Sequence, residues 1–158
     1  MITLLPPAFS ETEEKPVYNL VIIYEDMAAG KRAKHFCENL MRDLDEASLG
    51  IKDLWSFKVL DIPHVRRTAA EASAIADVVI LALNGHAELP DGIKAWMEQW
   101  SKQEADRKPI LLALFGASDD TQEAVVATRA FLGAIAETAG LTFLHTRRQA
   151  AMEDPLAA

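Results

Sequence analysis

Asp77-Val78-Val79-Ile80-Leu81-Ala82-Leu83 is the most hydrophobic stretch of the chain, and the polar residues Asn84 and Gly85 follow it at once. A short apolar run bounded by turn residues is typical of a strand that is buried on both faces. Residues 17–24 and 110–115 have the same character. Such strands need helices on both sides of a parallel sheet, so these runs predict an α/β fold.

Helical patterns separate the predicted strands. They begin near Asp26, at Pro63, at Pro90 and at the capping box formed by residues 120–123. Residues at helical spacing predict the inward faces of three of these helices: Ala33, Phe36, Cys37, Leu40, Met41 and Leu44; Ile93, Trp96, Met97 and Trp100; and Ala124, Ala127, Phe131, Ala134 and Ile135.

Two further strands are expected at residues 57–62 and 141–145, with a start near Trp55 left open for the first of them. Glycines mark the helix ends before both. Leu49-Gly50 is expected to end the first helical unit and Gly140 the last one. Five strands that alternate with helices through short connections predict a parallel sheet with right-handed crossovers. The expected architecture is a three-layer α/β/α sandwich with strand order 2-1-3-4-5, the flavodoxin-like arrangement.

The length of 158 residues suits one domain. We expect residues 1–16 to form a flexible leader outside the core, residues 17–148 to form the domain, and residues 149–158 to form a C-terminal tail. Cys37, the only cysteine, lies on an inward helix face, so we interpret it as a small buried hydrophobe.

The charge and the hydropathy of the chain exclude some classes of partner. The formal net charge is −8, which disfavours nucleic acids and anionic membranes because both select basic surfaces. No apolar run approaches the roughly 20 residues that a membrane-spanning helix needs. We therefore expect a cytoplasmic protein with a small ligand or a protein as its partner.

The candidate site follows from the predicted sheet. In such sheets ligands bind beyond the carboxyl ends of the strands, near the point where the strand order reverses. This rule selects the residues that follow the predicted strands: Glu25 and Asp26; Asn84, Gly85, His86 and Glu88; Gly116 and Ser118; and Arg147. No ligand spacing indicates a metal site, and no nucleophile motif indicates a catalytic triad, so no catalytic residue is predicted.

Residues 76–100 carry a family resemblance. Ala76-Asp77 opens the strand, Asn84-Gly85 lies in the loop after it, and Pro90-x-x-Ile93-Lys94 begins the next helix, which ends near Trp100. This stretch resembles the flavodoxin-like NAD(P)H-dependent FMN reductases. The resemblance implies that Asn84 and Gly85 would meet the flavin ring and that NAD(P)H would supply a hydride.

The loop after the first predicted strand departs from that family. Flavin-binding members hold the FMN phosphate there with hydroxyl groups and backbone amides at a helix N-terminus. In this chain Glu25 and Asp26 occupy the loop, and like charges about 4 Å apart repel by several kcal/mol at an effective dielectric near 20. Lys31 and Arg32 are expected on the solvated face of the helix, and they would offset this charge only if they folded back over the loop. The loop is therefore predicted to be acidic.

Three functions remain open. The first is a non-catalytic binding or regulatory module that acts through the carboxyl edge of the sheet. The second is an FMN-dependent NAD(P)H reductase. The third is a phosphate-independent signalling module, because Glu25-Asp26 resembles the acidic pair of response-regulator receiver domains, whereas Asn84 cannot form an acyl phosphate in place of their aspartate. We also expect a homodimer, through Trp96 and Trp100 or through the leader.

Overall fold

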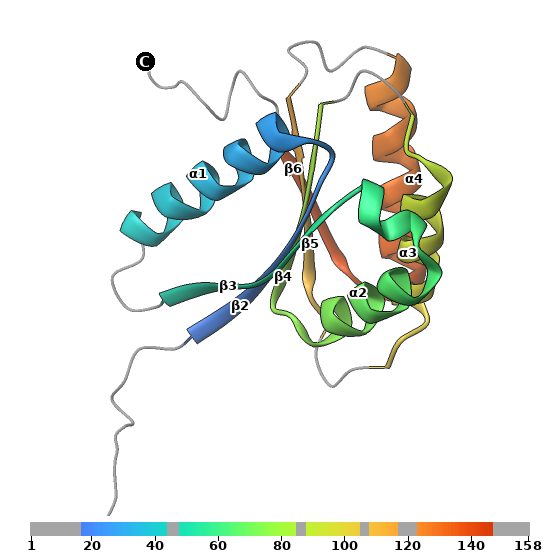
Figure 1. The fold of residues 1–158 in the computed structure, drawn as a ribbon, viewed down its shortest axis with the longest axis horizontal. Helices are drawn as coiled ribbons and strands as arrows, with labels where there is room; N and C mark the ends of the chain where they lie inside the picture. Colours follow the sequence, from blue (N-terminus) through green and yellow to red (C-terminus); the bar gives the residue numbers. More distant parts are fainter. Residues whose placement is uncertain (1–16, 44–47, 85–87, 105–107, 117–122, 147–158) are drawn as a thin grey trace, which may run out of the picture.

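A parallel β-sheet with helices on both faces forms the body of the protein (Figure 1). The computed structural model describes residues 17–43, 48–84, 88–104, 108–116 and 123–146. The prediction of an α/β fold with a parallel sheet is confirmed.

Strands and helices alternate along the chain. The strands are β2 (Val17–Tyr24), β3 (Ser48–Ser56), β4 (Val78–Leu83), β5 (Ile110–Phe115) and β6 (Thr142–Thr146). The helices are α1 (Met27–Asp43), α2 (Pro63–Ile75), α3 (Asp91–Ser101) and α4 (Glu123–Ala139), and a 3₁₀ turn, η1 (Lys58–Asp61), follows β3. The described sheet has the order β3-β2-β4-β5-β6 with parallel neighbours. Numbered along the chain, these five strands lie in the expected order 2-1-3-4-5.

The helices divide unequally between the two faces of the sheet (Figure 1). Helix α1 covers one face, where Leu20 and Ile22 of β2 pack against Cys37. Helices α2, α3 and α4 cover the other face, where Val21 and Ile23 belong to the larger core cluster. Alternate residues of β2 thus enter opposite cores, as the pleat of a strand requires. The described part of the chain has three layers.

The position of β3 corrects one prediction. The strand expected at residues 57–62 is instead the turn η1, and β3 runs through Leu49-Gly50, where the first helical unit was expected to end. Phe57 and Leu60 are buried because η1 packs against α2 and α3. A buried turn therefore produces the apolar pattern that predicted a strand. The edge strand β3 is hard to recognise because Ile51 and Leu54 are 42% and 41% exposed.

The inward face of α4 is a second correction. Its buried residues are Val125, Thr128, Leu132 and Ala136. Ala127 and Ala134, which were expected to face inward, are exposed, while Phe131 and Ile135 pack against the edge of the core. The helix carries apolar residues around its circumference, so spacing alone does not define which face is buried.

The tryptophans of α3 contradict one of the two expected dimer surfaces. Trp96 and Trp100 are 0% and 2% exposed, and their rings stack with centroids 5.4 Å apart. Together with Ile93 and Met97 they form the predicted buried stripe. They therefore cannot form the homodimer surface. The leader, the other surface expected for a dimer, lies outside the described residues.

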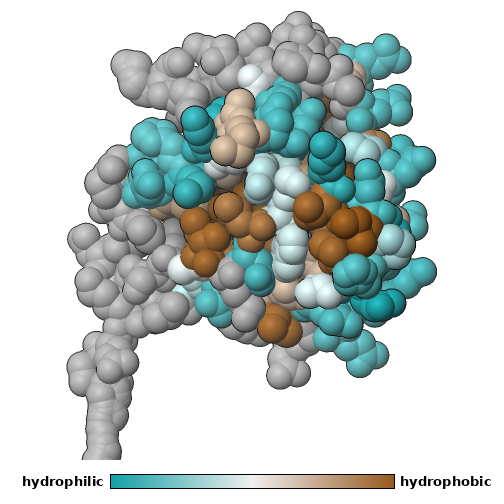
Figure 2. Space-filling view, viewed as in Figure 1, coloured by the Kyte–Doolittle hydropathy of each residue, from teal (hydrophilic) through white to brown (hydrophobic). Residues whose placement is uncertain are grey.

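The surface of the described residues is mixed. Exposed apolar side chains are spread over several elements, and they include Met27, Ile62, Ile75, Val126 and Leu144. In Figure 2 the hydrophobic side chains appear as separate groups among hydrophilic ones. None of the described helices combines the length and the apolar character that a bilayer crossing requires.

Gly140 ends α4 as predicted, and its conformation can be tested. It has φ +78°, and the amide of Leu141 donates to the Ala136 carbonyl at 2.8 Å. We expect Gly140→Ala to lower the free energy of unfolding by about 1 kcal/mol, because a side chain disfavours positive φ. Urea unfolding measures this. Gly133→Ala is the matched control: within α4 its Cβ would meet Phe143 at 3.8 Å, an ordinary contact, so it should stabilise the chain.

Cys37 is buried, as predicted, and should be unreactive. Burial raises the pKa of its thiol to about 11 from an ordinary 9.0, with a further contribution from Glu38. A disulfide reagent at pH 8 should therefore label the native chain roughly a hundredfold more slowly than the urea-unfolded chain. Because the folded-state pKa is raised, this burial stabilises the chain below pH 9, and the stabilisation falls as the pH rises toward 11. Equal labelling rates would contradict the prediction.

Candidate functional site

The carboxyl ends of β2 and β4 bring the predicted acidic residues next to Asn84. Strand order reverses at this point, because β3 lies on one side of β2 and β4 on the other. Glu25 and Asp26 follow β2, and Asn84 follows β4. Since parallel strands end at the same edge, residues 59 and 58 positions apart in sequence become neighbours.

A hydrogen-bond network joins these three side chains. The Asn84 backbone amide donates to Glu25 Oε1 at 2.8 Å. The Asn84 side-chain amide donates to Asp26 Oδ2 at 2.7 Å. Each carboxylate thus accepts a hydrogen bond from the same asparagine, and an amide between two acids separates charges that would otherwise repel each other.

Arg32 completes this network, contrary to the prediction that it is solvated. Its Nη2 donates to the Leu83 carbonyl at 3.2 Å and to Asn84 Oδ1 at 3.0 Å. A Cβ on Gly116 would overlap the Arg32 guanidinium, so the guanidinium lies against the end of β5. Lys31 is exposed, as predicted, but Arg32 is half-buried because its long side chain reaches from α1 across the sheet edge.

Asp26 caps α1, as predicted. Its Oδ1 accepts a hydrogen bond from the Ala29 amide at 3.0 Å. This bond lowers the pKa of Asp26 below 3.8, and the hydrogen bond from Asn84 and the charge of Arg32 lower it further. The helix N-terminus is therefore already occupied by a negative group of the protein itself.

The Asp26 cap predicts a pH-dependent stability. We expect Asp26→Ala to cost about 1 kcal/mol at pH 7, the usual value of such a cap at an exposed position. Because the folded-state pKa is depressed, the contribution of Asp26 is present above pH 3.8 and is lost as the pH falls through the folded-state pKa. Asp26→Asn, which keeps a capping oxygen, should cost less. Urea unfolding at pH 7 and pH 3 measures this. If the difference in unfolding free energy between wild type and Asp26→Ala were the same at both pH values, the prediction would be contradicted.

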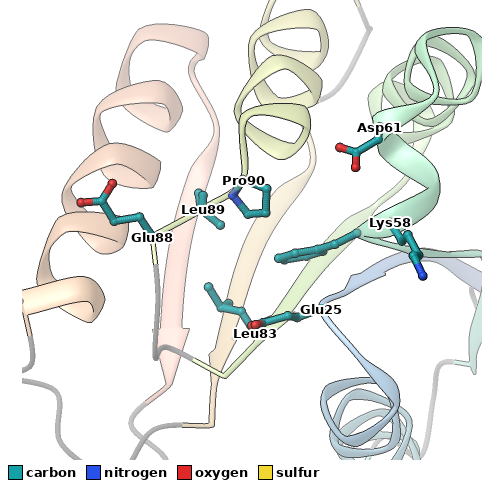
Figure 3. Close-up of a pocket in the computed structure, with 8 residues that line it drawn as sticks. Glu25, Lys58, Asp61, Leu83, Glu88, Leu89 and Pro90 are labelled. Carbon is teal, nitrogen blue, oxygen red and sulfur yellow. The ribbon is translucent and has the colours of Figure 1, made fainter.

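A pocket of about 390 Å³ opens on the other side of Glu25, between η1 and the start of α3 (Figure 3). Its buried wall is apolar, and its rim carries three carboxylates and one ammonium group. The lining residues are Glu25, Phe57, Lys58, Asp61, Leu83, Glu88, Leu89 and Pro90. Apolar walls with a few polar groups, placed at the switch point of the sheet, are typical of ligand sites.

The structure places the predicted site residues in two groups. Glu25, Asp26 and Asn84 come together in the network, and Gly116 lies beneath Arg32. Glu88 is not part of the network, but it lines the pocket together with Glu25. The remaining predicted residues, Gly85, His86, Ser118 and Arg147, lie outside the described residues.

Sequence reasoning missed Arg32 and most of the pocket. Phe57, Lys58 and Asp61 lie in or beside η1, a segment that the apolar pattern assigned to a strand. Leu89 is buried just before α3. Of the pocket-lining residues, only Glu25 and Glu88 were predicted as site residues, because each follows a predicted strand. Within the described ranges, no group of three or more His, Cys, Asp or Glu residues could hold a metal ion.

Comparisons with known proteins do not assign the chain to a family: no protein-family model matches it, and no curated protein is similar enough to match. The class of the protein is therefore defined by its α/β fold and its carboxyl-edge network.

Proposed function

We propose that this chain is a flavodoxin-like, non-catalytic binding or regulatory module that recognises a protein partner at the carboxyl edge of its sheet. The carrying observation is the network in which Glu25 and Asp26 are both bonded to Asn84. These groups are held in place by the protein itself, beside an open pocket. Such preorganisation favours recognition because little side-chain entropy is lost on binding.

The occupation of the α1 N-terminus supports this proposal over an FMN-dependent reductase. A phosphate at this place would use the free amides of the first helical turn. The Ala29 amide instead donates to Asp26, and the lowered pKa keeps that carboxylate charged at neutral pH. The Arg32 guanidinium donates to Leu83 and Asn84, so it does not offer those hydrogen bonds to a phosphate.

The form of the pocket supports a protein as the partner. Sites for small molecules usually enclose most of the ligand surface. Here Lys58, Asp61, Glu88 and Pro90 are all exposed on the rim. A rim of exposed polar side chains around a buried apolar wall has the same pattern as the core and rim of a protein interface.

A second candidate is a phosphate-independent, receiver-like signalling module. The convergence of Glu25 and Asp26 on Asn84 favours it, because this is where the resemblance to receiver domains places the acidic pair and the third-strand residue. In such a module the edge would signal through partner contacts and not through an acyl phosphate. Magnesium with beryllofluoride should leave the amide spectrum unchanged, and shifts at Asp26 and Asn84 would favour phosphate-dependent signalling instead.

Site-specific photo-crosslinking tests the proposed function. A photoreactive amino acid replaces Lys58 at the carboxyl edge, in the full chain and in the cells that produce it. The matched control replaces Lys102, which is also exposed but follows the opposite end of α3. We expect a discrete crosslinked protein from position 58 and none from position 102. No crosslink from position 58, or the same crosslinks from both positions, would contradict the proposal.

A further inference from the structure

The pocket beside Glu25 combines an apolar wall with a charged rim. Phe57, Leu83 and Leu89 are buried and form its apolar wall. Leu83 ends β4, and Leu89 directly precedes the exposed Pro90, so the wall joins the sheet to the start of α3. An occupant must therefore present apolar surface to this wall.

The rim of the same pocket is acidic. Glu25, Asp61 and Glu88 line it, and Lys58 is the one cation among its lining residues. Figure 3 shows the Lys58 ammonium and the Glu88 carboxylate both directed away from Leu83 and Pro90, whereas the Asp61 carboxylate turns toward the Pro90 side. The backbone amide of Asn84 holds the Glu25 carboxylate in place at this rim. The acidic groups thus exceed the cations, in agreement with the charge of −8 for the whole chain.

Gly92 places Asp61 at this rim. A Cβ on Gly92 would lie 2.5 Å from Asp61 Oδ1 and 3.2 Å from the Leu60 carbonyl. The missing side chain therefore lets the first turn of α3 approach η1 closely, and this approach forms one side of the pocket. The carboxylates stand around the pocket and are not gathered at one point, and no described group of them could hold a metal ion. This spacing suits an extended organic cation.

We propose that this pocket binds an arginine side chain of the partner protein. The aliphatic stem of arginine would lie on the wall of Phe57, Leu83 and Leu89, since long basic side chains cover apolar surface while their charged ends reach polar groups. The guanidinium would donate to Glu25 and Asp61, since its five N–H donors point in several directions and can serve more than one carboxylate. The inference rests on the proposed function and names the chemistry of its partner.

A titration of the full-length chain tests this inference. The probe is the peptide acetyl-Gly-Leu-Arg-Leu-Gly-amide, followed by amide chemical shifts, and the same peptide with glutamine in place of arginine is its control. Arginine amide alone tests for a free small cation. We expect shifts around Glu25, Lys58 and Leu89 with the arginine peptide, and binding at least several-fold weaker with the other two probes.

Variants separate charge recognition from folding. Asp61→Asn should lower the affinity for the arginine peptide about two- to fivefold, the range for one partly exposed ion pair. Lys58→Gln should raise this affinity by a similar factor, because it removes the cation from the pocket lining. Glu98→Gln is the control, because it removes the same charge from an exposed position nearer the other end of α3. Glu25→Gln should also lower the affinity for the arginine peptide. The urea unfolding curve of this variant shows whether the hydrogen-bond network around Asn84 is intact.

Three results would overturn the inference: no shifts at millimolar peptide, equal binding of the glutamine peptide, or arginine amide binding as tightly as the arginine peptide. If crosslinking from position 58 still succeeds, these results overturn only the arginine chemistry. If crosslinking fails as well, the proposed function fails with it.

Discussion

Replacing Trp96 with alanine should lower the free energy of unfolding by about 3–5 kcal/mol, the usual cost of removing a fully buried tryptophan side chain. Trp96 is 0% exposed, stacks on Trp100, and belongs to the core cluster that joins α3 to the sheet. The truncation removes this packing and leaves a cavity that the surrounding strand and helices can fill only in part. Urea unfolding followed by far-ultraviolet circular dichroism measures the loss.

Trp96→Phe is the matched control. The buried Nε1 of Trp96 has no hydrogen-bond partner among the described residues. Phenylalanine therefore removes an unpaired donor and keeps most of the apolar contact, so we expect a loss of about 1 kcal/mol. A Phe variant as unstable as the Ala variant would contradict this expectation, because it would show that the indole N–H makes a stabilising contact.

Replacing Asn84 with aspartate should destabilise the chain by about 2 kcal/mol at pH 7, because a carboxylate would then face Asp26 where an amide now donates at 2.7 Å. The attraction between Arg32 and the new charge offsets part of the repulsion, since Arg32 already donates to Asn84 Oδ1. This expected loss is larger than the one expected for Asp26→Ala in the same network.

The pH dependence identifies the cause of this loss. A like charge raises the folded-state pKa of each of the two carboxyl groups relative to its value without that neighbour, so the penalty is present at neutral pH, where both groups are ionised. It disappears as the pH falls below the unfolded values, where a protonated carboxyl can donate to Asp26 again. Asn84→Leu is the control, because it removes the donor without adding charge. An aspartate variant that is as stable as wild type at pH 7 would contradict the network.

The sequence predicts the centre of the fold and the edge strand β6 well, and the other edge strand, β3, poorly. β4 and β5 are continuous apolar runs because both of their faces are covered, and β5 is found where it was expected, at residues 110–115. β3 pairs with β2 on one side only within the described sheet, so its exposed Ile51 and Leu54 break the pattern of a buried strand. Phe57 and Leu60 then supplied a false strand signal from a buried turn.

The candidate site was predictable only as far as it depends on strand ends. Glu25, Asp26 and Asn84 follow strands that were recognised, and parallel strands bring their carboxyl ends together. Arg32 could not be placed, because its position on α1 is at the boundary between the buried and solvated faces, and only the folded edge shows where its guanidinium lies. Asp61 was missed together with the turn that carries it.

A titration of the purified full-length chain with FMN tests most directly the claim that the carboxyl edge is a recognition surface and not a flavin site. The capping of α1 by Asp26 and the acidic groups around Asn84 predict a colourless protein that leaves the fluorescence of micromolar FMN unchanged. A yellow protein, or strong quenching of the flavin at micromolar concentration, would contradict it.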